Sequence, residues 1–217
     1  MAKRKSLNNK GGTVFVTSDT HFYHKFLAFH RGYEDEVNMT NHMIDVWNSV
    51  VGENDTVVVI GDFSFGSVTQ TEQLLEDLNG DIILVAGNHD EMMKKRITRF
   101  NISIYDYLEV YSKGNDPDAE AVKVCMFHFP IISWNRMHQG AIHLHGHCHG
   151  GLFPIHSNRR SMDVGWDVLH KPVPLKDLVD RLKDQEFEQT DGHHIEKGSI
   201  KMGWVRRLAL WLWEKGK

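Results

Sequence analysis

Three short stretches in the first ninety residues are almost continuous in apolar or β-branched side chains: residues 13–17, 56–60 and 82–86. Runs of this length predict strands that are buried on both faces of a sheet. Each run is followed at once by polar residues that can bind a metal ion.

Helical patterns occupy the segments between these runs. Residues 41–50 place apolar side chains on one side of a helix, and Asn38 or Thr40 is the predicted cap. Residues 70–78 predict a second helix, which begins with the capping-box spacing of Thr69 and Glu72. Strands that alternate with helices predict an α/β sheet with crossover connections.

The pattern changes after residue 90. We predict a short basic helix at residues 91–99, strands at 102–111 and 122–128, and further strands at 141–144 and near Val164. The close return between residues 111 and 122 indicates a hairpin, and hence a second, partly antiparallel sheet. The predicted fold class is therefore α/β, a two-sheet mixed β-sandwich flanked by helices.

The chain is predicted to divide at residue 184. Residues 1–183 form the main domain, and residues 184–199 are a polar linker. Beyond the linker, apolar positions recur at helical spacing at Trp204, Val205, Leu208, Trp211 and Leu212. This amphipathic helix could dock on its own domain, join copies into a homo-oligomer, or lie at a membrane interface.

Composition narrows the class of protein. The 217 residues are 41% hydrophobic and 25% charged, and the net charge is −4, which gives no general attraction to nucleic acid. Two cysteines cannot form a disulfide framework, and neither a signal peptide nor a membrane span of the required length is visible. We therefore expect a cytoplasmic protein with no membrane span.

Candidate chemistry lies at the ends of the predicted strands. These positions are Asp19, His21, Asp62, Asn88, His89, His128, His147 and His149. The carboxyl ends of strands in an open α/β sheet meet at one edge, so these side chains should converge there. In the turn Gly146-His147-Cys148-His149, glycine permits a bend that lets each imidazole hold a different metal ion. Cys148 is a third ligand or, as we favour, a spacer that faces away.

These blocks, in this order, resemble the five signature blocks of the calcineurin-like metallophosphoesterase superfamily, and they span residues 19–149. Asp62-Phe63-Ser64-Phe65-Gly66 and His128-Phe129-Pro130-Ile131 resemble the small bacterial and phage-encoded members. The resemblance implies a four-layer metallophosphoesterase-like fold. It also implies hydrolysis of phosphate esters by a hydroxide that bridges two metal ions.

The resemblance implies two ligand sets that share Asp62. One metal would bind Asp19, His21, Asp62 and His149, and the other Asp62, Asn88, His128 and His147. A set of oxygen and nitrogen donors without thiolate favours Mn²⁺, Fe, Zn²⁺, Co²⁺ or Ni²⁺ over a structural zinc of the thiolate kind. We therefore expect the two sites that the resemblance implies to hold divalent ions, with Mn²⁺ as the first choice.

Other residues are assigned around the metals. The resemblance implies that His89, which follows a ligand without being one in the family pattern, is the catalytic histidine. It could protonate the leaving oxygen or stabilise the charge that develops on the phosphate. Asp90 is predicted to orient the His89 ring or to cap the helix that follows. His24, Arg31 and His143 are weaker candidates for contact with substrate phosphate.

Three functions remain open. The favoured one is hydrolysis of small phosphodiesters or cyclic nucleotides; the first alternative is a phosphomonoesterase, or nucleotidase, acting on nucleoside monophosphates. A non-catalytic scaffold with the same fold is the alternative of another class. A nuclease for long polymers is disfavoured, since no basic stripe accompanies the site.

Overall fold

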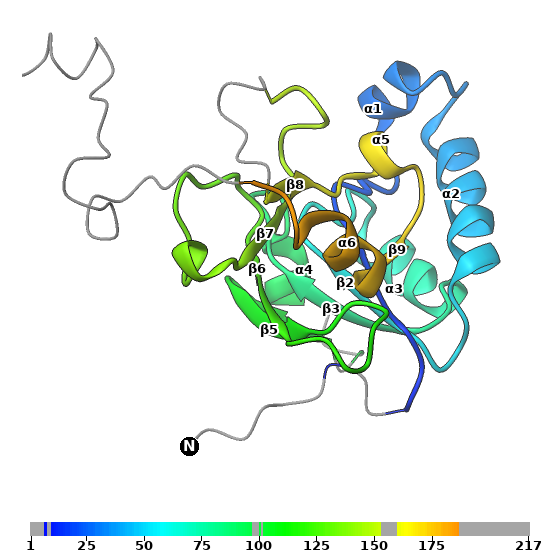
Figure 1. The fold of residues 1–217 in the computed structure, drawn as a ribbon. Coiled ribbons are helices and arrows are strands. Elements are labelled where there is room, and N and C mark those ends of the chain that lie inside the picture. Colours follow the sequence, from blue (N-terminus) through cyan, green and yellow to red (C-terminus); the bar gives the residue numbers. More distant parts are fainter. Residues whose placement is uncertain (1–6, 8–9, 97–99, 101, 153–159, 187–217) are drawn as a thin grey trace, which may run out of the picture. The chain divides into compact units, whose positions relative to one another are not determined.

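Two β-sheets packed face to face form the centre of the protein (Figure 1). The computed structural model describes residues 7, 10–96, 100, 102–152 and 160–186. The first sheet contains, in spatial order, β4 (Ser103–Tyr105), β3 (Asp81–Val85), β2 (Thr56–Val59), β1 (Val14–Thr17) and β9 (Val173–Pro174). The second contains β5 (Leu108–Ser112), β6 (Val122–Met126), β7 (Ile142–His145) and β8 (Ser161–Asp163).

Both sheets are mixed. Strands β1 to β4 run parallel, and β9 pairs with β1 in the antiparallel sense. In the second sheet, β5 and β6 are antiparallel, while β6, β7 and β8 are parallel. The predicted two-sheet mixed sandwich and its hairpin are confirmed.

Helices flank the sheets. They are α1 (Lys25–His30), α2 (Glu36–Val50), α3 (Val68–Asp77), α4 (Glu91–Arg96), α5 (Trp166–Leu169), α6 (Leu175–Leu182) and the 3-10 helix η1 (Met137–Gln139). In Figure 1, α2 and α3 lie on the side of the first sheet that faces away from the second. Within the described residues, the outer face of the second sheet is covered by the segment that carries Trp134 and η1.

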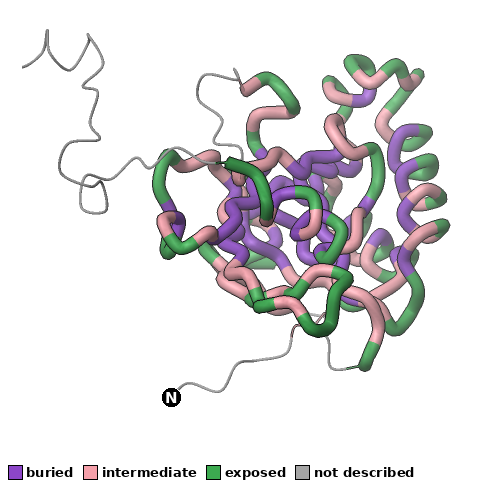
Figure 2. The backbone as a smooth tube through the Cα atoms, in the orientation of Figure 1, coloured by how far each residue is buried: buried purple, intermediate pink, exposed green. Residues whose placement is uncertain are grey.

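Alternate residues of the central strands enter different hydrophobic cores. Phe15, Val57 and Val59 pack with α2 and α3, whereas Val16 and Val58 pack between the two sheets. Figure 2 shows the result as buried backbone through the middle of both sheets. Burial on both faces explains why these strands read as continuous apolar runs.

Both predicted helix caps were wrong. Helix α2 begins at Glu36, because the Asp35 side chain accepts a hydrogen bond from the Asn38 backbone N–H at 2.7 Å. The capping box of α3 is formed by Ser67 and Gln70, two residues earlier than predicted. In each case a competent cap lay just upstream of the chosen one.

The single strand predicted at residues 102–111 is two strands in different sheets. The chain leaves the first sheet after β4 and enters the second at β5, with Asp106 and Tyr107 between them. Both strands are half-buried, so their apolar pattern continues across the break. Two segments for which no element was predicted, residues 22–37 and 129–140, contain α1 and η1.

Strand β8 ends at Asp163, directly before Val164, and α5, β9 and α6 follow it. The linker and the Trp-rich helix predicted after residue 184 lie almost entirely outside the described residues, and the division at 184 stays a prediction. No helix among the described residues has both the length and the hydropathy that a membrane crossing requires.

Candidate metal centre

Five strands deliver the predicted ligands to one place. Asp19 follows β1, Asp62 follows β2, Asn88 follows β3, His128 follows β6, and the turn with His147 and His149 follows β7. Potential ligand atoms within 4.8 Å of one another form two groups, one of Asp19, His21 and His149 and one of Asp19, Asp62 and His128. Asp19 is common to both.

Asp62 lies between two imidazoles. Its Oδ2 is 3.7 Å from Nε2 of His21 and 3.4 Å from Nε2 of His128. Burial alone would raise the pKa of this carboxyl. The hydrogen bonds with His128 and with the His89 backbone N–H outweigh burial and lower the pKa to about 2. The residue is therefore ionised at neutral pH, as a metal ligand must be.

The His21 ring tests whether the site fits a metal ion. Both ring nitrogens are buried and have no hydrogen-bond partner among the described residues. Nε2 lies 3.7 Å from carboxylate oxygens of both Asp19 and Asp62. A buried polar atom normally has a partner, and a cation between these three groups would supply one. The donor set thus fits a divalent ion.

Contacts at both ring nitrogens orient His128. Its Nδ1 lies 2.9 Å from the Ile60 carbonyl oxygen, and its Nε2 lies 3.1 Å from Oδ1 of Asn88 and near Asp62. The backbone carbonyl can fix the tautomer that leaves Nε2 free to bind a metal. Asn88 and His128, predicted to share one metal, are therefore adjacent.

The Gly146-to-His149 turn closes over Asp19. The His147 N–H donates to both Asp19 carboxylate oxygens, at 3.1 and 2.9 Å. A Cβ on Gly146 would lie 1.9 Å from Ser18 Oγ and 2.1 Å from Asp19 Oδ2, so only glycine fits there. Cys148 belongs to neither ligand group found among the described residues, and its role as a spacer stays a prediction.

The two histidines of this turn face different neighbours. His149 Nε2 is 3.7 Å from Asp19 Oδ1, and its ring stacks on His21 with centroids 5.0 Å apart. The exposed His147 ring instead lies edge-on to His128, with centroids 5.2 Å apart. The turn thus places the two imidazoles beside different candidate ligands, and the assignment of one metal ion to each stays a prediction.

Left-handed backbone is concentrated at the candidate ligands. Asp19, His21, Asp62, His147 and His149 have φ between 47° and 70°, and they are five of the eight non-glycine residues with positive φ among those described. Such conformations are unfavourable for side chains with a Cβ and gather at functional sites. This feature was not visible in the sequence.

Asp167, on α5, is a residue that the sequence analysis missed. Its Oδ2 lies 2.6 Å from Nδ1 of His149, and both of its carboxylate oxygens accept hydrogen bonds from Arg31. Burial would raise the pKa of Asp167, but His149 and Arg31 hold it well below the usual range. Asp167 therefore positions His149. Its only signal was an aspartate shortly after a predicted strand.

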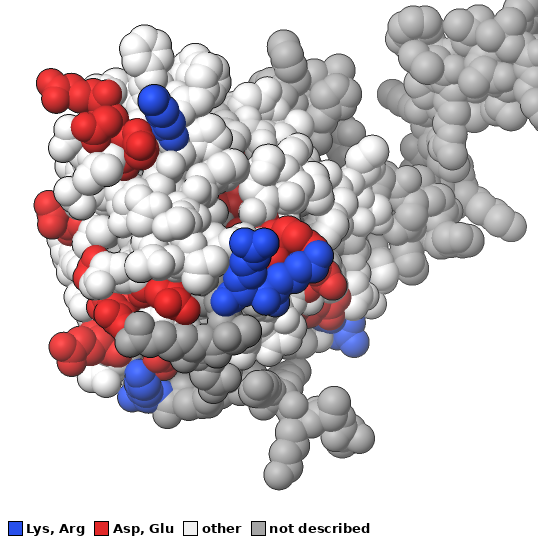
Figure 3. All heavy atoms as spheres, turned by 180° about the vertical axis from the view of Figure 1, so that it is seen from behind, with Lys and Arg blue, Asp and Glu red and all other residues white. Residues whose placement is uncertain are grey.

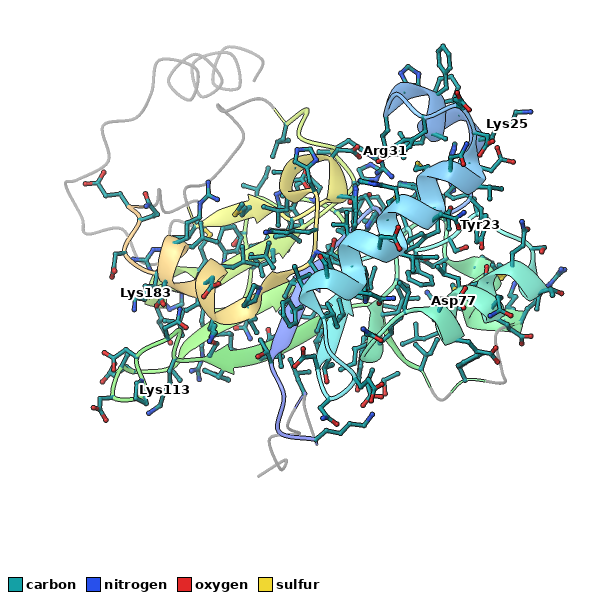
Figure 4. The ribbon with its side chains drawn as sticks, turned by 90° about the vertical axis from the view of Figure 1, so that its right-hand side faces the viewer. Tyr23, Lys25, Arg31, Asp77, Lys113 and Lys183 are labelled. Carbon is teal, nitrogen blue, oxygen red and sulfur yellow. The ribbon has the colours of Figure 1, made fainter. Side chains whose placement is uncertain are left out.

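Arg31 supports the candidate metal centre through hydrogen bonds from its guanidinium group. Besides its two bonds to Asp167, it donates to the backbone carbonyls of Thr20 and Asp19, both at 2.8 Å. Figure 4 shows Arg31 between α1 and α5. Its guanidinium is thus engaged with the protein, and the predicted contact with substrate phosphate is replaced by a positioning role.

Asp90 directly precedes α4, and its backbone carbonyl accepts a hydrogen bond from the Lys94 N–H at 3.0 Å, but its side chain neither caps that helix nor contacts the His89 ring. Its buried carboxylate accepts hydrogen bonds from the backbone N–H groups of Gly87, Asp62 and Phe63, at 2.7, 2.8 and 3.0 Å. It therefore ties the loop after β2 to the loop after β3. The exposed His89 ring lies next to Phe65 and His21, at centroid distances of 4.9 and 6.2 Å.

His24 and His143, the two remaining candidates for contact with substrate phosphate, lie in different places. His24 caps α1 and lies at the rim, with its ring 5.5 Å from His21 and 4.2 Å from Phe65. His143 is fully buried, and its nitrogens meet the Cys125 carbonyl oxygen and the Ile131 N–H. The structure does not bring His143 to the site.

Fold and site together define a two-sheet α/β protein with a candidate dinuclear metal centre at the strand ends. The chain belongs to the calcineurin-like phosphoesterase family, whose model matches residues 12–207. Members of this family bind divalent metals and are hydrolases of phosphoric esters.

Relatives of similar length are known from archaea and phages. The chain is 31% identical over 197 residues to the uncharacterized protein MJ1445 of Methanocaldococcus jannaschii, covering 86% of this chain and 93% of that one. It is 29% identical over 194 residues to the Gene 66 protein of Mycobacterium phage D29, covering 80% and 97%. These relatives agree with the predicted resemblance to small phage-encoded members.

A solved structure shows the same fold. The protein of unknown function AQ665 from Aquifex aeolicus superposes with a TM-score of 0.57 at 20% identity, covering 77% of this chain and 98% of that one.

Proposed function

We propose that the protein hydrolyses small phosphodiesters, with two divalent metal ions held by Asp19, His21, Asp62, Asn88, His128, His147 and His149. The observation that carries this proposal is the buried, unpartnered imidazole of His21 facing two carboxylates where the strand ends meet. When bound, a metal pair activates water and offsets the charge of the phosphate. Mn²⁺ is the first choice, with Fe, Zn²⁺, Ni²⁺ and Co²⁺ as alternatives.

His89 supplies the proton in this proposal. Its backbone is fixed by the bond from its N–H to Asp62 Oδ1 at 2.9 Å, while its ring is exposed beside the centre. An exposed imidazole at this position can reach the leaving oxygen of an ester and protonate it. Asp90 acts on His89 only indirectly, by holding the loops on either side.

The charge around the centre favours a diester over a monoester. A dianionic monoester calls for additional cations, but the guanidinium of Arg31 is paired with Asp167 and His143 is buried away from the site. His89 and His147 are exposed, so their side of the centre is open to solvent. A singly charged diester, including a cyclic nucleotide, suits this environment better than a nucleoside monophosphate does.

A long nucleic acid is a poor fit. On the face in Figure 3, the Lys and Arg side chains of the described residues are few and lie beside Asp and Glu. On α4, Lys94 pairs with Asp106 and Lys95 with Glu91. Paired charges give little attraction to a phosphate backbone.

Hydrolysis of bis(p-nitrophenyl) phosphate and p-nitrophenyl phosphate with added Mn²⁺ tests the proposal. We expect turnover of both, faster for the diester, and its loss in Asp62→Asn. Asp45→Asn, an exposed aspartate on α2, is the matched control and should retain the rate. An inert Mn²⁺-loaded protein across panels of monoesters and diesters contradicts the proposal.

Calorimetric titration with Mn²⁺ separates an enzyme from a scaffold. The proposed enzyme binds two equivalents, and Asp62→Asn binds fewer. A scaffold that kept only the fold would bind no stoichiometric metal.

A further inference from the structure

Phe65 is a large apolar side chain held beside the candidate metal centre without being buried. It is 40% exposed, although its neighbours Phe63 and Ser64 are 0% and 4% exposed. Its ring centroid lies 4.2 Å from that of His24, 4.9 Å from that of His89 and 5.2 Å from that of His21. An exposed aromatic ring among imidazoles is typical of the wall of a ligand site.

The loop that carries Phe65 is fixed on both sides. The Phe65 N–H donates to the Phe22 carbonyl at 2.8 Å, and Phe22 and Ser64 form a β-bridge. Ser64 Oγ accepts from the Gly66 N–H and lies 2.9 Å from the Thr71 hydroxyl. The backbone that carries the ring is therefore held in place before any ligand binds, which reduces the entropy lost on binding.

Phe65 lies on the side of the centre where the leaving group of the substrate would be. Its ring is next to His89, the proposed donor of a proton to the leaving oxygen. A group attached to that oxygen would therefore lie against Phe65. Aromatic and heteroaromatic rings gain a specific attraction to the phenylalanine ring beyond the area they bury, whereas an aliphatic ring of similar size gains mainly from burial.

We propose that Phe65 is the specificity-determining residue for the leaving group, and that the substrates carry an aromatic or heteroaromatic group on that side of the phosphate. This inference rests on the proposed phosphodiesterase function and narrows its substrate class. A nucleobase is one such group.

Binding of two non-hydrolysable phosphinates to the Mn²⁺-loaded protein tests the proposal. Methyl(phenyl)phosphinate and methyl(cyclohexyl)phosphinate are both monoanions with two P–C bonds, and they differ in the flatness of one six-membered ring. Calorimetry should show the phenyl compound binding about three- to ten-fold more tightly.

Substitutions of Phe65 test whether its ring causes this difference in affinity. Phe65→Ala and Phe65→Leu should bring the ratio of the two affinities close to one, and Phe65→Trp should keep it. Phe29→Ala removes a ring on α1 that is 78% exposed and contacts His30, and this control should keep the wild-type ratio.

The outcomes separate this proposal from the one on which it rests. A wild-type protein without the preference, or a preference that survives Phe65→Ala, overturns the role of Phe65 even if hydrolysis is observed. A preference that depends on Phe65 in a protein that hydrolyses no ester supports the aromatic site and contradicts the proposed reaction. Binding of neither phosphinate contradicts the role of Phe65.

Discussion

Carboxylates outside the predicted ligand sets also decide where the candidate ligands lie. Asp90 is completely buried, and it joins two ligand-bearing loops by accepting three backbone hydrogen bonds. Asp167 holds His149 in the same indirect way. Such residues control the precision of a metal site although their own atoms lie outside it.

Replacement of Asp90 should therefore affect both stability and metal binding. Asp90→Ala leaves three N–H donors, two of them buried, without an acceptor, and we expect it to cost about 2–4 kcal/mol of unfolding free energy. Urea denaturation of the metal-free protein measures this loss. An unchanged midpoint would show that water replaces the carboxylate. Asp90→Asn keeps one acceptor oxygen and should lose less.

Calorimetric titration with Mn²⁺ can test the role of Gly146. In Gly146→Ala the new Cβ would meet Ser18 and Asp19 at less than 3 Å, which must displace the Asp19 carboxylate. We expect Mn²⁺ affinity to fall by about 10- to 100-fold. Gly52→Ala is the control, because its nearest contact for a new Cβ is 3.4 Å. Equal affinities in the two variants would contradict the assigned geometry.

Strands were easier to predict than the ends of helices. The continuous runs in β1, β2 and β3 follow from burial on both faces, a strong signal in one sequence. Caps depend on single polar side chains, and several candidates preceded α2 and α3 within a few residues. The change of sheet between β4 and β5 left no trace, since both strands are half-buried.

A buried histidine on strand β7, His143, makes the stability of the protein depend on pH. Burial lowers the pKa of His143 to about 4 from the ordinary value of 6.5. Between these values the unfolded chain binds a proton that the native protein does not, so stability falls as pH drops from 6.5 to 4. This contribution is fully present above pH 6.5 and amounts to at most about 3 kcal/mol.

Denaturation of His143→Gln as a function of pH isolates that contribution. The variant has no imidazole to protonate, so it should lose less stability than the wild type between pH 6.5 and 4. Parallel losses in the two proteins would mean that His143 is readily protonated in the native state. Trp134 and His145, whose ring centroids each lie 5.3 Å from that of His143, are present in both the wild type and the variant.

At the scale of the whole molecule, the sequence predicted that five strand ends meet in one site. Parallel strands bring their carboxyl ends to a common edge of the sheet. The partners of each side chain were not predicted. Arg31, His149 and Asp167 come from three different segments of the chain and meet only in the folded protein, where both Arg31 and His149 contact the Asp167 carboxylate. No periodicity in the sequence connects them, so Arg31 was assigned to substrate and Asp167 was missed.

Metal binding should stabilise the whole protein. A ligand present at 100 times its Kd adds about 2.7 kcal/mol to the unfolding free energy. For a chain of this size, this corresponds to a rise in Tm of about 5–10 °C. Differential scanning calorimetry with Mn²⁺ and with EDTA measures the change. Asp62→Asn should show little of it, and an equal rise in that variant would point to metal bound elsewhere.

The left-handed backbone at five candidate ligands sets function against stability. Each such residue costs roughly 1–2 kcal/mol relative to ordinary backbone, and a glycine at the same position would avoid most of that cost. His147→Gly should therefore make the metal-free protein as stable as the wild type or slightly more so. With Mn²⁺ the order should reverse, because the variant lacks a ligand. Selection for thermal stability alone, without metal, would be expected to erode this site first.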